Sequence, residues 1–205
     1  MFLKRFAPVF AAVVALALVP VPSCAQSGPT ASRPLEISAF GGLTGTYTGI
    51  SGGRNLGITA GLDVGLRPYH GFRPYLEGRG TAAVDGGQID SMKDALGGVR
   101  VDHRVLLPGL RAYGDFLIGR GEIKYERGGY PALFGPFLYL SSVTTVLSPG
   151  VGVEYRLDEH FSALADAQLQ HWDTPVTPSG SVWAKPLTLG VRYRFNFNRH
   201  GYALP

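Results

Sequence analysis

The segment Lys185-Pro186-Leu187-Thr188-Leu189-Gly190-Val191-Arg192-Tyr193-Arg194-Phe195-Asn196-Phe197 decides the fold of this chain. Its side chains alternate, so that one face collects leucine, valine and aromatic residues while the other collects threonine, glycine, arginine and asparagine. Strict alternation is the period of a β-strand with one apolar and one polar face. Because the polar face carries Arg192 and Arg194, the segment suits a barrel that is apolar outside and charged inside.

Runs with the same alternation precede this segment along most of the chain. They span residues 35–43, 55–67, 72–84, 95–105, 110–125, 143–157 and 161–172. In the run 110–125 the alternation weakens beyond Gly119, so we expect that strand to leave the membrane there. The even set of runs predicts an all-β, eight-stranded antiparallel up-and-down transmembrane β-barrel over residues 35–197.

The connections between the runs differ in length. The short ones are residues 68–71, 106–109 and 158–160, and the longer ones are 44–54, 85–94, 126–142 and 173–183. Short and long connections alternate, as in outer-membrane barrels, where short turns face the periplasm and long loops face outward. We therefore expect both termini to lie on the periplasmic side.

A soluble, lipocalin-like periplasmic carrier is the alternative fold, since it shares the strand number but holds an apolar ligand inside. Its outer face would carry solvating lysine and glutamate, whereas lysine is almost absent from these runs. Arginine and carboxylates share the polar face instead, and the planar guanidinium suits desolvated pairing with carboxylates.

We expect these charges to form a self-neutralising network that fills the lumen of so narrow a barrel. A narrow pore is the alternative for this lumen. The predicted network comprises Glu77, Arg79, Arg100, Asp102, Arg104, Arg111, Asp115, Glu154, Arg156, Asp166, Arg192 and Arg194.

The N-terminus has the pattern of a secretory signal peptide. Lys4 and Arg5 precede an apolar run, and Ser23 and Ala25 allow cleavage before Gln26. The run is shorter than the roughly 20 residues of a membrane helix. The formal net charge is +4, of which Lys4 and Arg5 supply two, so the exported chain lacks the basic excess of a nucleic-acid binder.

We expect residues 1–25 to be the signal peptide, 26–34 a short periplasmic segment, and 198–205 a C-terminal tail. Cys24 offers a second processing route, because Val21-Pro22-Ser23-Cys24 resembles a bacterial lipobox, although Pro22 departs from that pattern. Cys24 is the only cysteine, so no intramolecular disulfide forms.

The chain resembles small outer-membrane β-barrel proteins of the OmpA transmembrane-domain or OmpX kind. The most specific resemblance is to their C-terminal assembly signal, here Thr188, Gly190, Tyr193 and Phe195. The resemblance implies that the barrel-assembly machinery reads this signal and that outer-membrane lipids surround the barrel. Family members often end at the final aromatic residue, whereas this chain continues to Pro205, so Phe197 is an alternative terminal aromatic.

Aromatic residues gather at both ends of the runs, as in the interfacial girdles of membrane barrels. Those expected in girdles are Tyr69, Phe72, Tyr75, Tyr155, Phe161, Tyr193, Phe195 and Phe197 at the short turns, and Tyr47, Tyr125, Tyr130, Phe134, Phe137, Tyr139, Trp172 and Trp183 towards the long loops. The loop 127–139 is unusually apolar. It is either a contact surface or a segment that folds back over the barrel mouth.

No residue pattern points to catalysis, a cofactor or a metal. In the lipid A deacylase family, which shares the strand number, a His-x-Ser pair lies near the last strands, but here Trp172 and Asp173 follow His171. The histidines His70, His160 and His200 lack the close spacing of zinc ligands. We therefore expect a non-enzymatic protein of the bacterial outer membrane with a structural or surface-interaction role, carried by loops that bind a surface ligand. A lipid-modifying enzyme is the alternative.

Overall fold

The computed structural model describes residues 36–85, 87, 89–105, 107–125, 128–131, 136 and 138–195. The expected signal peptide, the segment 26–34, the tail 198–205 and Phe197 lie outside the described residues. So do Phe134 and Phe137 of the long loop. No helix among the described residues is long and apolar enough to cross a membrane.

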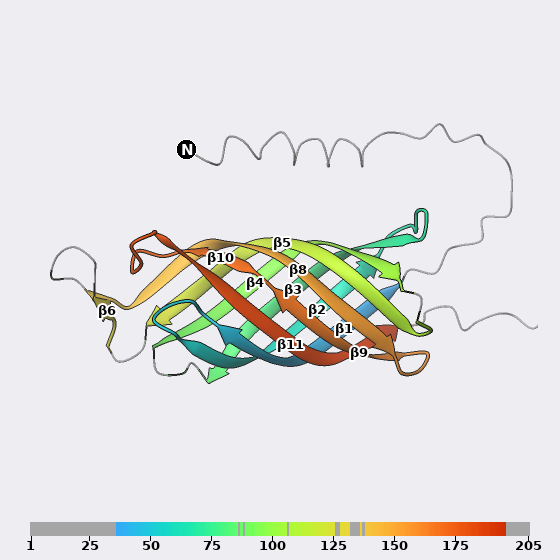
Figure 1. Cartoon of the computed structure of the whole chain (residues 1–205), viewed down its shortest axis with the longest axis horizontal. Coiled ribbons are helices and arrows are strands. Elements are labelled where there is room, and N and C mark those ends of the chain that lie inside the picture. Colours follow the sequence, from blue (N-terminus) through green and yellow to red (C-terminus); the bar gives the residue numbers. More distant parts are fainter. Residues whose placement is uncertain are drawn as a thin grey trace, which may run out of the picture. The chain divides into compact units, whose positions relative to one another are not determined.

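The described residues form a closed antiparallel β-barrel of eight strands (Figure 1), which confirms the predicted fold. The strands are β1 (Ile37–Tyr47), β2 (Arg54–Gly65), β3 (Phe72–Asp85), β4 (Asp90–Arg104), β5 (Leu110–Tyr125), β8 (Ser141–Arg156), β9 (Phe161–Gln168) with β10 (Gln170–Asp173), and β11 (Ser181–Phe195). Each strand pairs with its neighbour along the chain, and β1 pairs with β11 to close the barrel. A small hairpin of β6 (Tyr130–Pro131) and β7 (Leu138–Tyr139) lies between β5 and β8.

β9 and β10 are two parts of one barrel strand. Both pair with β8 on one side and with β11 on the other, in the same register before and after Leu169. The break falls beside two prolines, Pro149 on β8 and Pro186 on β11. Proline has no N–H to donate to the ladder, so the hydrogen-bond pattern is interrupted there, although Leu169 still donates to the Pro149 carbonyl at 2.9 Å.

The ladder is staggered around the barrel. Ile37 pairs with Val64 on β2, and following the register through each strand leads back to β1 at Tyr47, which pairs with Lys185. Such a stagger requires the strands to tilt against the barrel axis, as Figure 1 shows. The interior of an eight-stranded barrel is then just wide enough for side chains to fill.

One end of the barrel, the turn end, carries the connections 66–71, 105–109 and 157–160. At the first of these, Tyr69 and Phe72 exchange backbone hydrogen bonds across His70 and Gly71. Both central residues have positive φ, at 46° and 84°, the geometry of a type I′ hairpin turn. In the last turn, backbone N–H groups of Phe161 and His160 donate to Asp158 and lower the pKa of its carboxyl.

The opposite end, the loop end, carries the connections 48–53, 86–89, 126–140 and 174–180. All four are shorter than expected, because β1, β3 and β10 extend to Tyr47, Asp85 and Asp173, and β4, β8 and β11 begin at Asp90, Ser141 and Ser181. The predicted segregation of short and long connections is therefore incomplete. Only the connection between β5 and β8 is long, and the strands themselves project further at this end.

The inside of the barrel changes character along its length. Towards the loop end it holds an apolar cluster, which we call the apolar plug: Ile50, Met92, Leu96, Leu117, Ile123, Tyr125, Val146, Trp172, Val176, Val182 and Ala184. Three residues expected in interfacial girdles are buried inside the barrel, namely Tyr75, Tyr125 and Trp172. For these three the girdle prediction was wrong, because each occupies an inward position of its strand.

Glycines on the inward face make room for the largest side chains of the lumen. A Cβ atom at Gly121 would overlap the Trp172 ring, and one at Gly152 would overlap the Tyr113 ring. Side chains cannot be added to a filled interior without displacing neighbours.

We expect Gly121→Val to destabilise the barrel by about 1–3 kcal/mol, the usual cost of overpacking. Gly45→Val is the matched control, because a Cβ atom at Gly45 has no neighbour within 4 Å. Urea unfolding of both variants in lipid vesicles, followed by the heat-dependent shift in gel migration, measures the difference. Equal midpoints for the two variants would show that the Trp172 ring does not need the space above Gly121.

Candidate functional site

The twelve residues of the predicted lumen network fall into two groups. Eight are buried inside the barrel: Glu77, Arg79, Arg100, Asp102, Asp115, Glu154, Asp166 and Arg192. The other four lie nearer the turn end; Arg194 and Arg111 are half-buried there, and Arg104 and Arg156 are exposed. The buried eight make two clusters of ion pairs.

The first cluster surrounds Arg79 near the middle of the lumen. Its guanidinium donates to Glu77 at 2.7 Å and to Asp166 at 2.7 Å. Asp115 lies 3.7 Å from the same guanidinium. One cation therefore faces three carboxylates, and neutral donors supply the remaining hydrogen bonds. The Gln168 amide donates to Asp115 at 3.0 Å, and the Tyr113 hydroxyl donates to Asp166 at 3.0 Å.

The second cluster lies closer to the turn end and centres on Glu154. Arg100 donates to this carboxylate at 3.0 Å and Arg192 at 2.9 Å, while Arg194 also contacts it. Asp63 lies 3.2 Å from Arg192, and Asp102 lies 2.7 Å from Arg100. Three cations and three carboxylates balance in this cluster. Since Arg100, Glu154 and Asp63 are almost fully buried, each depends on its partners to remain charged.

Aromatic rings separate the guanidinium groups inside the barrel. The Arg100 guanidinium lies 3.9 Å from the centre of the Tyr113 ring, and those of Arg79 and Arg192 lie 5.6 Å and 5.1 Å from the Phe40 ring. Cations over ring faces are attracted by the negative face of the ring. Phe40 and Tyr113 therefore stabilise the clusters as well as fill space between them.

A row of threonines lies between the charged clusters and the apolar plug. Thr44 shares hydrogen bonds with Thr59 at 2.6 Å and with Thr188 at 2.8 Å, and Thr59 bonds Thr81 at 3.0 Å. From the turn end to the loop end, the lumen is thus filled by ion pairs, then hydroxyls, then the apolar plug, beside which Thr48, Asp90 and Gln170 are also buried. This order of layers leaves side chains across the lumen at every level.

The sequence interpretation missed several of these groups. The predicted network omits Asp63, Glu36, Arg73 and Phe40. Glu36 accepts from Arg73 and from the Tyr75 hydroxyl, the latter at 3.0 Å. Inward parity could have found Arg73, which lies four residues before Glu77 on β3, whereas β1 and β2 carry no predicted network residue from which Glu36, Phe40 and Asp63 could have been counted.

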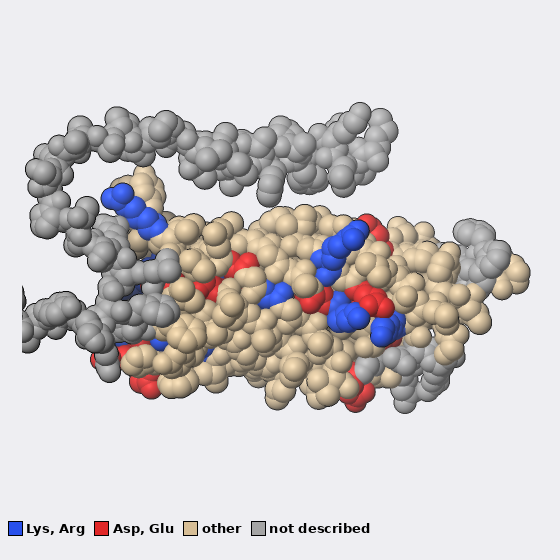
Figure 2. All heavy atoms as spheres, turned by 180° about the vertical axis from the view of Figure 1, so that it is seen from behind, with Lys and Arg blue, Asp and Glu red and all other residues tan. Residues whose placement is uncertain are grey.

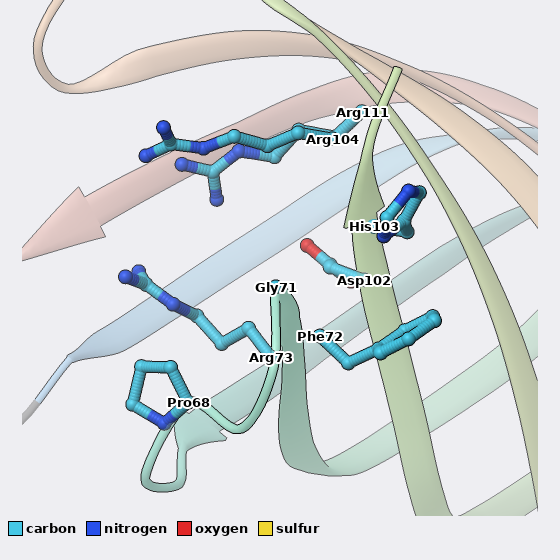
Figure 3. A pocket seen from close by; sticks show the side chains of 8 residues that line it. All are labelled: Pro68, Gly71, Phe72, Arg73, Asp102, His103, Arg104 and Arg111. Atoms are coloured by element: carbon cyan, nitrogen blue, oxygen red, sulfur yellow. The ribbon is translucent and has the colours of Figure 1, made fainter.

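A pocket of about 200 Å³ opens at the turn end between β3, β4 and β5 (Figure 3). Arg104 and Arg111 are directly opposite each other on β4 and β5, and their side chains run side by side in Figure 3. Among the described residues neither arginine forms an ion pair, whereas Arg73 contacts Glu36. Like charges directly opposite each other destabilise a sheet, and the Asp102 carboxylate, which also lines the pocket, offsets part of this positive charge.

The outer wall also changes character along the barrel. In the half nearer the turn end the outer wall is apolar, with exposed side chains such as Phe116 and Ile118 on β5. Towards the loop end the outward positions of the same strand are Arg120, Glu122 and Lys124, while Leu117, Ile123 and Tyr125 point inward. Figure 2 shows a largely uncharged wall, with one group of charged side chains towards the loop end and others at the turn end.

This inversion corrects the interpretation that alternation fades beyond Gly119. The alternation continues, but its polarity reverses, from apolar outside to apolar inside. Lys93, Lys124 and Lys185 lie within strands β4, β5 and β11, so lysine is less rare in the strands than the sequence interpretation held. A wall that is apolar outside suits lipid, and one that is polar outside with an apolar core suits water.

The predicted assembly-signal residues lie on both faces of β11. Tyr193 and Phe195 point outward with ring centres 5.0 Å apart, and Tyr193 also packs against Phe161 at 5.1 Å. Thr188 points into the threonine row. At Gly190 a Cβ atom would overlap the backbone of β1, so this position requires glycine for the first and last strands to approach.

The described histidines lie apart from one another. His70 and His160 are in turns, and His103 and His171 are on the outer wall, where their rings lie 4.8 Å from those of Phe72 and Trp183. Among the described residues, no group of three or more histidine, cysteine or carboxylate side chains could hold a metal ion.

A closed barrel with an apolar outer band, a polar lumen and short turns at the end where the first strand begins and the last strand ends defines the class of small outer-membrane β-barrels. The family model described as "Outer membrane protein beta-barrel domain" matches residues 9–195. The chain belongs to this family. No curated protein matches significantly.

Solved structures share the fold at low sequence identity. Neisserial surface protein A is 12% identical with a TM-score of 0.51, over 80% of this chain and 97% of that one. Ail, the attachment invasion locus protein of Yersinia pestis, is 15% identical with a TM-score of 0.48, over 79% and 98% of the two chains. The N-terminal barrel domain of Pseudomonas aeruginosa OprF is 18% identical with a TM-score of 0.41, over 77% and 97%. At these identities the likeness shows the fold alone.

We expect Glu154→Gln to destabilise the barrel by about 3–5 kcal/mol, because it leaves three buried or half-buried arginines without their shared carboxylate. Asp173→Asn is the matched acid-to-amide control, since 69% of its side chain is exposed. Urea unfolding in lipid vesicles measures both. A Glu154→Gln barrel as stable as Asp173→Asn would mean that the second cluster does not depend on this carboxylate.

We expect Arg104→Gln to raise stability by about 0.2–1 kcal/mol, the range for cross-strand charge pairs. Added salt should stabilise the unsubstituted protein more than the variant, because salt screens the repulsion between Arg104 and Arg111. Unfolding midpoints at low and high salt test this. A variant that is less stable than the original chain at low salt would rule out net repulsion at this pair.

Proposed function

We propose that the protein is a closed, non-enzymatic barrel of the bacterial outer membrane, with a structural and surface-interaction role carried by its loop end. The filled lumen is the observation that supports this proposal most strongly. Two ion-pair clusters, a threonine row and the apolar plug occupy successive levels of the interior. A barrel filled in this way supports no continuous water path, so the loop end is the part left to meet other molecules.

Part of the connection between β5 and β8 covers the barrel mouth, and part of it is exposed as a contact surface. Tyr130 and Tyr139 pack against the apolar plug, and the Tyr130 hydroxyl shares a hydrogen bond of 2.6 Å with Ser51. These two aromatic side chains therefore fold back over the barrel mouth. Leu138 and Leu140 remain exposed at 62% and 67%, so they are the described apolar residues of this connection that are free to contact a partner.

Planar-bilayer recordings of the refolded chain test the closed state. We expect no stable single-channel steps. The lumen has two separate seals, so Trp172→Ala, which opens only the apolar plug, should also remain closed, as should Arg192→Gln, which weakens only the second cluster. The double variant is the one expected to conduct. Regular steps from the unsubstituted protein would instead support the narrow-pore alternative.

The enzymatic alternative is tested separately. Mass spectrometry of lipid A from a strain lacking the protein and from its parent should give the same spectra. A loss or gain of an acyl chain or headgroup in the deletion strain would replace the structural role with a lipid-modifying one.

A further inference from the structure

We propose that the outer wall over β3, β4 and β5 is a binding site for a phosphate-bearing glycolipid of the outer leaflet, with the loop end facing outward. The inference goes beyond the structural and surface role, because it concerns the wall of the barrel and a lipid ligand. It rests on two features that lie side by side, a basic patch and an apolar groove.

The basic patch consists of Lys93, Arg120, Lys124 and the single carboxylate of Glu122. Lys93 and Glu122 are cross-strand partners with an ion pair of 2.7 Å. Arg120 forms no ion pair with any residue that the structure describes. Three cations against one carboxylate leave the patch positive. Arginine and lysine side chains of this kind form strong, charge-assisted hydrogen bonds with phosphate.

The groove beside the patch has a volume of about 530 Å³. Its floor consists of small side chains, Ala60, Gly80, Ala82 and Ala95, and Lys93 and Arg120 lie at its border. The register places these residues in adjacent rows, with Ala60 opposite Gly80, Gly80 opposite Ala95, and Ala95 opposite Arg120. The nearest atom to a Cβ built at Gly80 is 3.5 Å away, so the groove has room for further apolar atoms.

The two features lie at the level where the outward residues of β5 change from apolar to charged. Ile118 points outward on the same strand, two residues from Arg120 on the side of the turn end. A lipid presents its acyl chains and its charged headgroup across the same boundary. A phosphorylated glycolipid can therefore lay an acyl chain in the groove and bring its phosphate to Arg120 and Lys93, which neither a free phosphate nor an uncharged lipid can do.

A second copy of the chain is a weaker candidate for this wall. In a two-fold symmetric dimer the same patch would meet itself, so Arg120 and Lys124 of one copy would face their equivalents. That repulsion disfavours self-association through this face, whereas it favours an anionic ligand.

The test uses the exported full chain refolded in a zwitterionic detergent, with bound lipid measured by native mass spectrometry. The probes are diphosphorylated lipid A, the same lipid after removal of its phosphates, and inorganic phosphate alone. We expect the diphosphorylated lipid to bind at least about tenfold more tightly than the dephosphorylated one, which corresponds to about 1.4 kcal/mol. Inorganic phosphate should compete only weakly.

Matched variants separate the patch and the groove from the rest of the wall. Arg120→Gln should weaken binding of the diphosphorylated lipid about tenfold, and Lys185→Gln, an outward lysine on β11, should leave it unchanged. Gly80→Leu should weaken binding by filling the groove. Gly114→Leu is its control, because Gly114 also faces outward on β5 and a Cβ atom there has its nearest neighbour at 3.8 Å.

Three results would overturn the proposal: equal affinity for the dephosphorylated lipid, equal losses in Arg120→Gln and Lys185→Gln, or binding of phosphate alone that Gly80→Leu does not change. Heat-dependent gel migration confirms that each variant is folded. Conductance is measured independently, so failure of the lipid site and failure of the closed-barrel function are distinguishable.

Discussion

The pairing of β1 with β11 is the constraint on which the rest of the structure depends. It closes the sheet, so that no strand edge is left unpaired in lipid, where an unsatisfied backbone group is costly. Closure with this number of strands also fixes a narrow interior. That interior must be filled, and any charge inside it needs a partner. The clusters around Arg79 and Glu154, and the glycines beside Trp172 and Tyr113, follow from this one requirement.

The two faces of β5 also exchange their polarity along the strand. Over the part of β5 nearer the turn end, Phe116 and Ile118 face outward while Tyr113 and Asp115 face inward. Beyond Gly119 the outward positions become charged and the inward ones apolar. A strand has only two faces, so this reversal is the pattern expected where β5 passes from lipid to water, although Val143, the β8 partner of Glu122, is apolar and exposed. The apolar plug is then the ordinary core of a barrel segment that stands in water, and the basic patch lies at the boundary.

Much of the fold could be predicted from the sequence because strand alternation is a local property that each run displays by itself. In the closing segment the apolar residues from Leu187 to Phe195 face outward, as predicted. Trp172 could not be placed, because an aromatic residue near a strand end suits a lipid interface as well as a plug, and only the register decides. Arg104 and Arg156 were assigned to the network by parity, but they lie at the turn end, where the lumen opens and no buried carboxylate reaches them.

The reversal of polarity on β5 predicts that this strand passes from lipid to water between Ile118 and Lys124. Spin labels on cysteine variants of the exported chain in lipid vesicles test it most directly, by comparing collision with oxygen, which concentrates in lipid, and with a water-soluble nickel complex. We expect Ile118→Cys to collide with oxygen, Lys124→Cys to collide with the nickel complex, and Leu117→Cys to be shielded from both. Oxygen collision at Lys124→Cys as frequent as at Ile118→Cys would contradict it.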